Sequence, residues 1–217
     1  MTEPIIVSPS ILSGNFADMG SSVRSVKTWG GDWIHCDVMD GVYVTNLTFG
    51  MPMVAALRKV TDLPLDVHLM ITKPERYVKR FAESGADLIT FHPEASDDPA
   101  ETLRIIKECG KKAGIALNPN VPVEDFADLL PECDIVVIMT VYAGYGGQKL
   151  IPECLEKVKK IKEFAEKAGK PVYIEVDGGV TEENAAMVKR YGANVLVAGS
   201  AVFKSSDPAK TIGILKG

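Results

Sequence analysis

Short apolar runs rich in β-branched residues alternate along the chain with longer segments of helical spacing. The runs expected to form strands span residues 5–11, 33–39, 65–70, 88–92, 115–118, 135–141, 172–177 and 195–198. The segments expected to form helices span residues 16–29, 53–60, 74–83, 99–112, 123–130, 152–168, 182–191 and 208–215. Strands that alternate with helices favour a parallel sheet, because each parallel neighbour needs a crossover connection. Eight such repeats predict an α/β fold, a (β/α)₈ TIM barrel formed by residues 1–217 as a single domain.

The composition is typical of a folded chain and excludes intrinsic disorder. Of the 217 residues 24% are charged and 46% hydrophobic, and the net charge is −5. This acidic balance argues against a nucleic-acid or acidic-membrane partner. The apolar run 135–141 is far shorter than the roughly 20 residues of a spanning helix. Met1-Thr2-Glu3-Pro4 lacks the features of a signal peptide, and the four cysteines form no C-x-x-C pair. We therefore expect a cytoplasmic protein with reduced thiols.

Polar side chains gather where the predicted strands end, which is where barrels of this kind place their active sites. Because side chains alternate along a strand, His35 and Asp37 should face the barrel interior, as should His68 and Asp177. Each histidine alone could be a hydrogen-bonded core residue. The four together favour a divalent metal site, because two imidazoles and two carboxylates suit Zn²⁺, Fe²⁺, Mn²⁺ or Co²⁺. By the same alternation Asp66 and Glu175 lie one layer deeper, where they either orient the imidazoles or are structural. His92 remains open and could support the site beside Glu94.

Glycine-rich turns follow three of the predicted strands. Gly178-Gly179 and Gly199-Ser200 precede the last two predicted helices. Backbone N–H groups freed by glycine at a helix start bind phosphate, and these two loops are the recurrent phosphate site of the fold. The loop 140–150 has three glycines and could close as a lid that excludes water. Three methionines at strand ends either fill the core or form an apolar floor under a substrate.

A set of motifs, in order along nearly the whole chain, resembles the ribulose-phosphate 3-epimerase family. The motifs are Ser8-Pro9-Ser10-Ile11-Leu12, residues 35–41, Asn46-Leu47-Thr48-Phe49-Gly50, Asp66-Val67-His68-Leu69-Met70, Ala116-Leu117-Asn118-Pro119, residues 144–148, Val176-Asp177-Gly178-Gly179 and Val197-Ala198-Gly199-Ser200-Ala201. The resemblance implies a (β/α)₈ barrel with one divalent metal ion per chain, most often Zn²⁺ or Fe²⁺, with Mn²⁺ or Co²⁺ as further options.

The resemblance also implies roles for individual residues. The metal ligands match His35, Asp37, His68 and Asp177, and the acid/base pair matches Asp37 and Asp177. The substrate contacts match Ser10, His68, Met39, Met70, Met139, Gly144, Tyr145, Gly146, Gly147, Gly178, Gly179, Gly199 and Ser200. The implied reaction is 3-epimerisation of D-ribulose 5-phosphate to D-xylulose 5-phosphate, by proton transfer between two aspartates through a metal-stabilised enediolate. The implied partner is a small sugar phosphate. Because barrels of this kind often associate, we also expect a homo-oligomer.

Some positions depart from the family pattern, all of them in loops expected at the barrel mouth. Tyr142-Ala143 replaces the usual Asn-Pro, Tyr145 replaces Phe, and Val42 and Thr45 stand where His and Pro are usual. Residues 92–94 and 139–141 also resemble the D-allulose 6-phosphate 3-epimerase branch, whose product is D-fructose 6-phosphate. Both branches use the same metal and acid/base pair, so the substrate remains open at this point.

Two other interpretations compete with an epimerase. A phosphosugar decarboxylase of the orotidine or ketogulonate phosphate type uses Asp-x-Lys-x-x-Asp, whereas the strand ends here hold no lysine. A non-catalytic phosphosugar-binding barrel would keep the ligand residues but would not exchange the C3 hydrogen of a ketose with solvent. Metal analysis combined with an epimerase assay distinguishes these possibilities.

Overall fold

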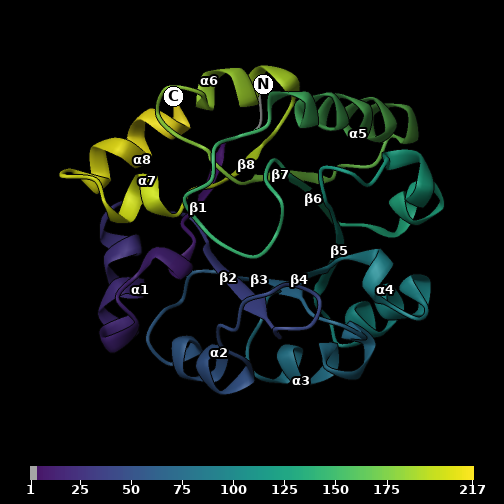
Figure 1. The fold of residues 1–217 in the computed structure, drawn as a ribbon, viewed down its shortest axis with the longest axis horizontal. Helices are drawn as coiled ribbons and strands as arrows, with labels where there is room; N and C mark the ends of the chain where they lie inside the picture. Colours follow the sequence, from purple (N-terminus) through teal and green to yellow (C-terminus); the bar gives the residue numbers. More distant parts are fainter. Residues whose placement is uncertain (1–3) are drawn as a thin grey trace.

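In the computed structural model, which describes residues 4–217, eight parallel strands form one sheet with the order β1-β8-β7-β6-β5-β4-β3-β2. The strands are β1 (Ile6–Ser8), β2 (Ile34–Met39), β3 (Leu65–Met70), β4 (Leu88–Phe91), β5 (Lys112–Leu117), β6 (Ile135–Met139), β7 (Tyr173–Asp177) and β8 (Val195–Val197). The helices lie around the outside of this ring of strands (Figure 1). The predicted (β/α)₈ barrel is confirmed.

The ring closes between β1 and β2 through a short contact rather than a full ladder. Strand β1 stops after Ser8, because Pro9 has no N–H to donate to a neighbouring strand. Ser10 then forms an isolated parallel bridge with His35, and the His35 N–H donates to the Pro9 carbonyl at 3.1 Å. The closure therefore brings Ser10 beside the first candidate ligand.

The helices mostly follow the sequence pattern. They are α1 (Met19–Thr28), α2 (Met51–Arg58), α3 (Val78–Glu83), α4 (Pro99–Glu108), α5 (Leu155–Ala168), α6 (Ala185–Tyr191), α7 (Ser200–Phe203) and α8 (Pro208–Lys216). The short α7 was not predicted.

Three expectations about local structure were wrong. The segment predicted as a helix over 123–130 is a kinked 3₁₀ segment, Val123–Glu132, which contains Pro131. Helix α4 ends at Glu108 instead of continuing to 112, because Gly110 turns the chain at a φ of 72° and β5 begins at Lys112. The helix expected over 182–191 begins only at Ala185, which leaves Gly178-Gly179 several residues before α6.

Two layers of apolar side chains lie on either side of the strands. The layer between strands and helices includes Cys36 and Val38 of β2. The layer inside the barrel includes Val137 and Met139 of β6. In the same layer the Trp33 ring packs edge-on against the Tyr173 ring, with 5.0 Å between the ring centroids. This alternation confirms the predicted parity, because odd and even positions of one strand face opposite layers.

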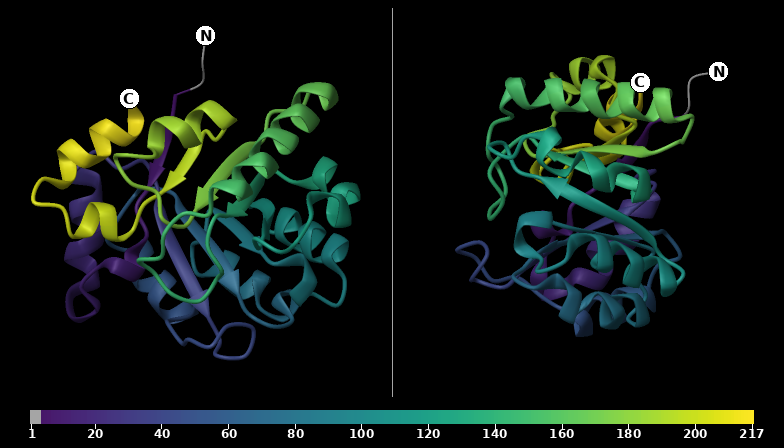
Figure 2. Two further views of the ribbon diagram at one scale, coloured as in Figure 1. Left: turned by 45° about the horizontal axis from the view of Figure 1, so that its top comes forward. Right: turned by 90° about the vertical axis from the view of Figure 1, so that its right-hand side faces the viewer.

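Two long loops protrude from the same end of the barrel. The side view in Figure 2 shows the loop after β2 and the loop after β6 at that end, and Figure 1 shows the loop after β6 lying across the opening. The candidate ligands lie at this end, as the fold requires. Among residues 4–217, no helix is both long and apolar enough to cross a membrane. None of the four cysteines forms a disulfide within the described residues.

Candidate active site

Four side chains from three strands converge at the barrel mouth. His35 Nε2 lies 3.3 Å from Asp37 Oδ1 and 3.7 Å from Asp177 Oδ2. His68 Nδ1 lies 3.6 Å from each of the same two oxygens. Two ring nitrogens and two carboxylate oxygens thus surround one point, all within 4.8 Å of one another. The structure brings together all four ligands that the sequence predicts.

The chemistry of this quartet fits a divalent cation. His35 Nε2 and His68 Nδ1 are buried, and neither atom has a hydrogen-bond partner in the described part of the chain. Buried polar atoms are normally paired, so two unpaired nitrogens that face two carboxylates indicate a missing positive partner. Nitrogen and oxygen donors in this proportion suit Zn²⁺ and related metals.

Acidic side chains below His35 hold its ring in place. Asp66 Oδ2 contacts His35 Nδ1 at 2.6 Å, and Glu175 Oε1 lies 3.4 Å from the same nitrogen. Burial lowers the pKa of His35, but the charges of Asp66 and Asp37 raise it well above its ordinary value. Burial raises the pKa of Glu175, and the neighbouring charge of Asp66 raises it further. Of the two roles left open for Asp66, this contact favours orientation of the imidazole.

Asp37 is the most heavily contacted carboxylate of the quartet. Burial raises its pKa, but the adjacent imidazoles of His35 and His68 lower it well below the usual range. Ser10 Oγ donates to Asp37 Oδ2 at 2.5 Å. The side chain is therefore an anion whose two oxygens face different partners, Oδ1 the imidazoles and Oδ2 the serine.

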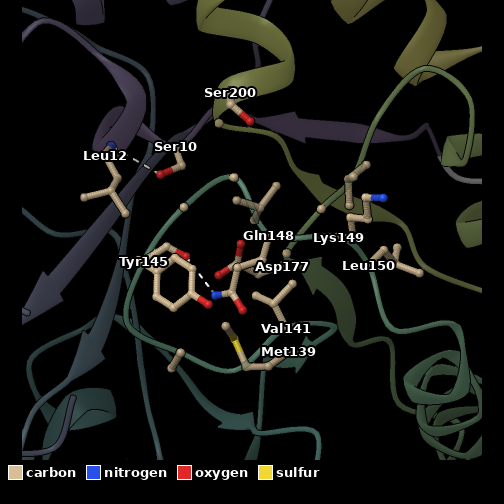
Figure 3. Close-up of a pocket in the computed structure, with 18 of the residues that line it drawn as sticks. Ser10, Leu12, Met139, Val141, Tyr145, Gln148, Lys149, Leu150, Asp177 and Ser200 are labelled. Atoms are coloured by element: carbon tan, nitrogen blue, oxygen red, sulfur yellow. Dashed lines mark hydrogen bonds between the residues drawn. The ribbon is translucent and has the colours of Figure 1, made fainter. Parts of the chain in front are cut away.

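A cavity of about 560 Å³ opens above the quartet. Asp37 and Asp177 line it, whereas His35 and His68 are fully buried and do not. Its lining includes nearly all the predicted substrate contacts, namely Ser10, Met39, Met70, Met139, Gly144, Tyr145, Gly146, Gly147, Gly178, Gly179, Gly199 and Ser200. Figure 3 shows Met139, Asp177 and Ser10 around this cavity, with Tyr145 and Gln148 of the loop after β6. The volume suits a small metabolite.

One wall of the cavity is lined by backbone of the turns after β7 and β8. Among the backbone hydrogen bonds outside the helices and strands of residues 4–217, none is donated by the N–H groups of Gly178, Gly179, Gly199 or Ser200. Gly178 and Gly179 have φ values of 119° and 68°, which a side chain would disfavour. Clustered backbone amides in glycine-rich turns of this kind attract an anion such as a phosphate group.

Sequence reasoning missed several residues that shape this mouth. Asn46 Nδ2 donates to the Gly144 carbonyl at 2.9 Å and so joins the two mouth loops. Gln148 Nε2 donates to the Tyr142 and Tyr145 carbonyls at 2.8 and 2.9 Å. Asn46 lies in one of the motifs named above, but nothing in its sequence context indicates which backbone it contacts.

His92, which the sequence left open, contacts the candidate ligand His68 directly. Its Nε2 lies 3.0 Å from His68 Nε2, and both rings are fully buried. Burial lowers the pKa of His92 to about 4. Burial raises the pKa of Glu94, but the adjacent His92 ring and the hydrogen bond from Tyr43 lower it to about 2. His92 is therefore neutral and Glu94 charged at neutral pH.

The fold and the site together define a (β/α)₈ barrel with a candidate metal centre at the strand ends. The model of the ribulose-phosphate 3 epimerase family matches residues 6–203. The ribulose-phosphate 3-epimerase of Bacillus subtilis (strain 168) is 50% identical over 214 residues, which cover 98% of this chain and 99% of that protein. The chloroplastic ribulose-5-phosphate-3-epimerase of Arabidopsis thaliana is 49% identical over 98% of this chain and 76% of that protein. The chain belongs to the ribulose-phosphate 3-epimerase family, whose members are isomerases acting on carbohydrates.

More distant solved structures share the fold. KGPDC from Streptococcus mutans has a TM-score of 0.72 and 15% identity, covering 99% of this chain and 96% of that one. The 3-keto-L-gulonate-6-phosphate decarboxylase of Vibrio cholerae has a TM-score of 0.72 and 17% identity, covering 99% and 96%. At such low identity the likeness establishes the barrel and leaves the chemistry to the site itself.

Proposed function

We propose that this protein is a metal-dependent 3-epimerase that interconverts D-ribulose 5-phosphate and D-xylulose 5-phosphate. The observation that supports this most strongly is the placement of Asp37 and Asp177. These carboxylates reach one cavity from different strands while sharing two buried imidazoles. Inversion at carbon requires a proton to leave one face and another to arrive at the opposite face, so two separate acid/base groups are needed.

His35, Asp37, His68 and Asp177 would hold the metal. When bound, a divalent cation supplies Lewis-acid stabilisation of the negative charge that develops on the ketose oxygens during proton removal. Zn²⁺ or Fe²⁺ is the preferred ion in this proposal, and Mn²⁺ or Co²⁺ fits the same donor set.

The protein side chains perform the proton transfer. The C3 proton of a 2-ketose is acidic because the adjacent carbonyl accepts the charge that is left behind. One aspartate removes this proton and the other delivers a proton to the opposite face. Ser10 holds Asp37 through the 2.5 Å hydrogen bond to Oδ2 and so fixes the plane of that carboxylate. Met39, Met70 and Met139 give the cavity an apolar floor that keeps water from the reacting carbon.

The backbone amides of Gly178, Gly179, Gly199 and Ser200, which line the cavity, would bind the phosphate group. The loop 140–150 would cover the substrate, with Gly144, Tyr145, Gly146 and Gly147 against it. His68 is also a candidate substrate contact in this proposal, although it lies buried behind the cavity wall. Binding energy from the phosphate, which lies away from the reacting carbon, would then help to hold the loop closed.

Three broader properties belong to the same proposal. Residues 1–217 act as one barrel domain, which the single eight-stranded sheet supports. Four free cysteines support a cytoplasmic, reducing location. Exposed apolar side chains such as Phe16 and Leu47 support a homo-oligomer, which sedimentation velocity would test.

A paired kinetic assay tests the proposed function. The protein is purified gently, its metal content is measured, and kcat/KM is compared for D-ribulose 5-phosphate and D-allulose 6-phosphate. We expect a clear preference for the pentose phosphate, together with exchange of the C3 hydrogen in deuterated solvent. Tight binding of the sugar phosphate without C3 exchange would instead identify a binding protein.

A further inference from the structure

The contact between His68 and His92 restricts where each ring can carry its proton. His68 faces the ligand quartet with Nδ1, and a metal ligand must present a lone pair there. The proton of a neutral His68 is therefore on Nε2. That N–H donates across 3.0 Å to His92 Nε2, which must accept. His92 then carries its own proton on Nδ1, on the side of the ring away from the quartet.

The group that faces His92 Nδ1 is the Glu94 carboxylate. Glu94 Oε1 lies 3.7 Å from this nitrogen, close enough for its charge to favour a proton there. Asn118 Nδ2 is nearer, at 3.3 Å, but it is a donor. Its two hydrogens have acceptors in Tyr43 Oη at 2.7 Å and Glu94 Oε1 at 3.2 Å. Asn118 therefore does not need His92 Nδ1 as an acceptor, and that nitrogen can carry the proton.

Tyr43 holds the carboxylate where it can act. Its hydroxyl donates to Glu94 Oε1 at 2.8 Å, and its ring lies 4.8 Å from the His92 ring at an interplanar angle of 36°. Tyr43 belongs to the loop after β2, and Glu94 follows β4. Two mouth segments thus meet over one buried imidazole.

We propose that Glu94 is a positioning residue for the metal centre, which acts through His92 to hold His68 in the tautomer whose Nδ1 lone pair faces the ligand quartet. Tyr43 and Asn118 support Glu94 in this role. The inference rests on the proposed function, because the tautomer of His68 matters only if His68 is a ligand.

The other imidazole of the quartet has the same kind of support in a direct form. Asp66 contacts His35 Nδ1 at 2.6 Å, which keeps the proton there and leaves Nε2 for the quartet. Ligand histidines commonly donate their second N–H to a carboxylate, and loss of that carboxylate typically weakens metal binding. For His68 the carboxylate is one imidazole further away, and His92 transmits its effect.

The test measures metal affinity rather than turnover. Co²⁺ is titrated into the full-length protein in competition with a chelator of known affinity, and binding is followed by visible absorption. Glu94→Gln removes the charge and keeps the side-chain size, and Tyr43→Phe removes the hydroxyl that holds the carboxylate. The matched controls are Glu124→Gln, at an exposed pair with Lys160, and Tyr77→Phe, at a tyrosine that packs against the outer core.

We expect Glu94→Gln to weaken Co²⁺ binding by roughly tenfold to a hundredfold. Tyr43→Phe should weaken it by a smaller factor, and both controls should stay within about twofold of the wild type. Wild-type affinity in a folded Glu94→Gln protein would overturn the proposal, as would an equal loss in the controls. If Glu94→Gln fails to fold by circular dichroism, Tyr43→Phe decides the question by the same criterion.

These outcomes separate the inference from the proposed function. A wild type that binds Co²⁺ tightly and a Glu94→Gln variant that binds it weakly support the inference even if neither epimerises a ketose phosphate. Normal epimerase activity together with unchanged Co²⁺ affinity in Glu94→Gln overturns the inference and leaves the proposed function intact.

Discussion

Replacement of Gly179 by alanine tests the proposed phosphate site most directly. Gly179 has a φ of 68°, and an added Cβ would stand 2.3 Å from Leu150 N and 2.8 Å from Gln148 O. Both neighbours are backbone atoms at the end of the loop after β6, so no side-chain rotation relieves the overlap. Ordinary contacts begin near 3.4 Å, so the loop or the turn must shift by about 1 Å.

The cost of the backbone conformation sets the expected loss of stability in Gly179→Ala, and a lost hydrogen bond to the phosphate sets the expected decrease in kcat/KM. The left-handed backbone costs an alanine roughly 1–2 kcal/mol, which lowers stability. A 1 Å shift also removes at least one amide from the proposed phosphate position, and a hydrogen bond to a charged group is worth roughly 1.5–3 kcal/mol. That loss corresponds to a decrease in kcat/KM of roughly tenfold to 150-fold.

Gly110→Ala is the matched control. Gly110 has a φ of 72°, has no atom within 4 Å of the position an added Cβ would take, and lies between α4 and β5, at the opposite end of the barrel. The Gly110→Ala protein should lose a similar free energy of unfolding, measured with urea, while its steady-state kinetics remain unchanged. A folded Gly179→Ala protein with kcat/KM within roughly threefold of the wild type would refute the phosphate assignment.

The other predictions concern the reacting groups and the packing. Asp37→Asn and Asp177→Asn should each lower kcat by roughly 10²–10⁴-fold in a coupled epimerase assay, and near-normal turnover of either metal-loaded variant would contradict the two-base scheme. Removal of divalent metal by a chelator should abolish activity and lower the thermal unfolding temperature, and both should recover when Zn²⁺ or Fe²⁺ is restored. An unchanged unfolding temperature after verified metal loss would contradict a metal bound by the folded state. Gly114→Ala would place a Cβ 2.1 Å from the Ile135 carbonyl oxygen and should destabilise the protein by roughly 1–3 kcal/mol in urea unfolding.

Much of the candidate site could be predicted from the sequence because it depends on local geometry. His35 and Asp37 are two residues apart on one strand, so they must share a face wherever that strand lies. His68 and Asp177 follow the same rule at the ends of β3 and β7. The barrel then places all strand ends at one mouth, and the observed distances of 3.3–3.7 Å agree with that expectation.

Predictions that depended on where a helix begins or ends were less accurate. Residues 123–130 have helical spacing, but Pro131 follows closely and the segment packs as 3₁₀ turns. The helix predicted to begin at residue 182 begins only at Ala185, and just before it Asn184 Nδ2 donates to the Gly179 carbonyl at 2.9 Å. In both places a residue close to the predicted boundary decides where the helical turns form.

The amino-acid sequence by itself determined which side chains face the barrel interior and which end of each strand they occupy, because both follow from a period of two along a strand. Only the tertiary structure decided which of them touch. The contacts of His68 with His92, and of Tyr43 with Glu94, join segments that are far apart along the chain. No local pattern predicts such pairs, because they form only when the sheet closes and its curvature brings separate loops over the same point.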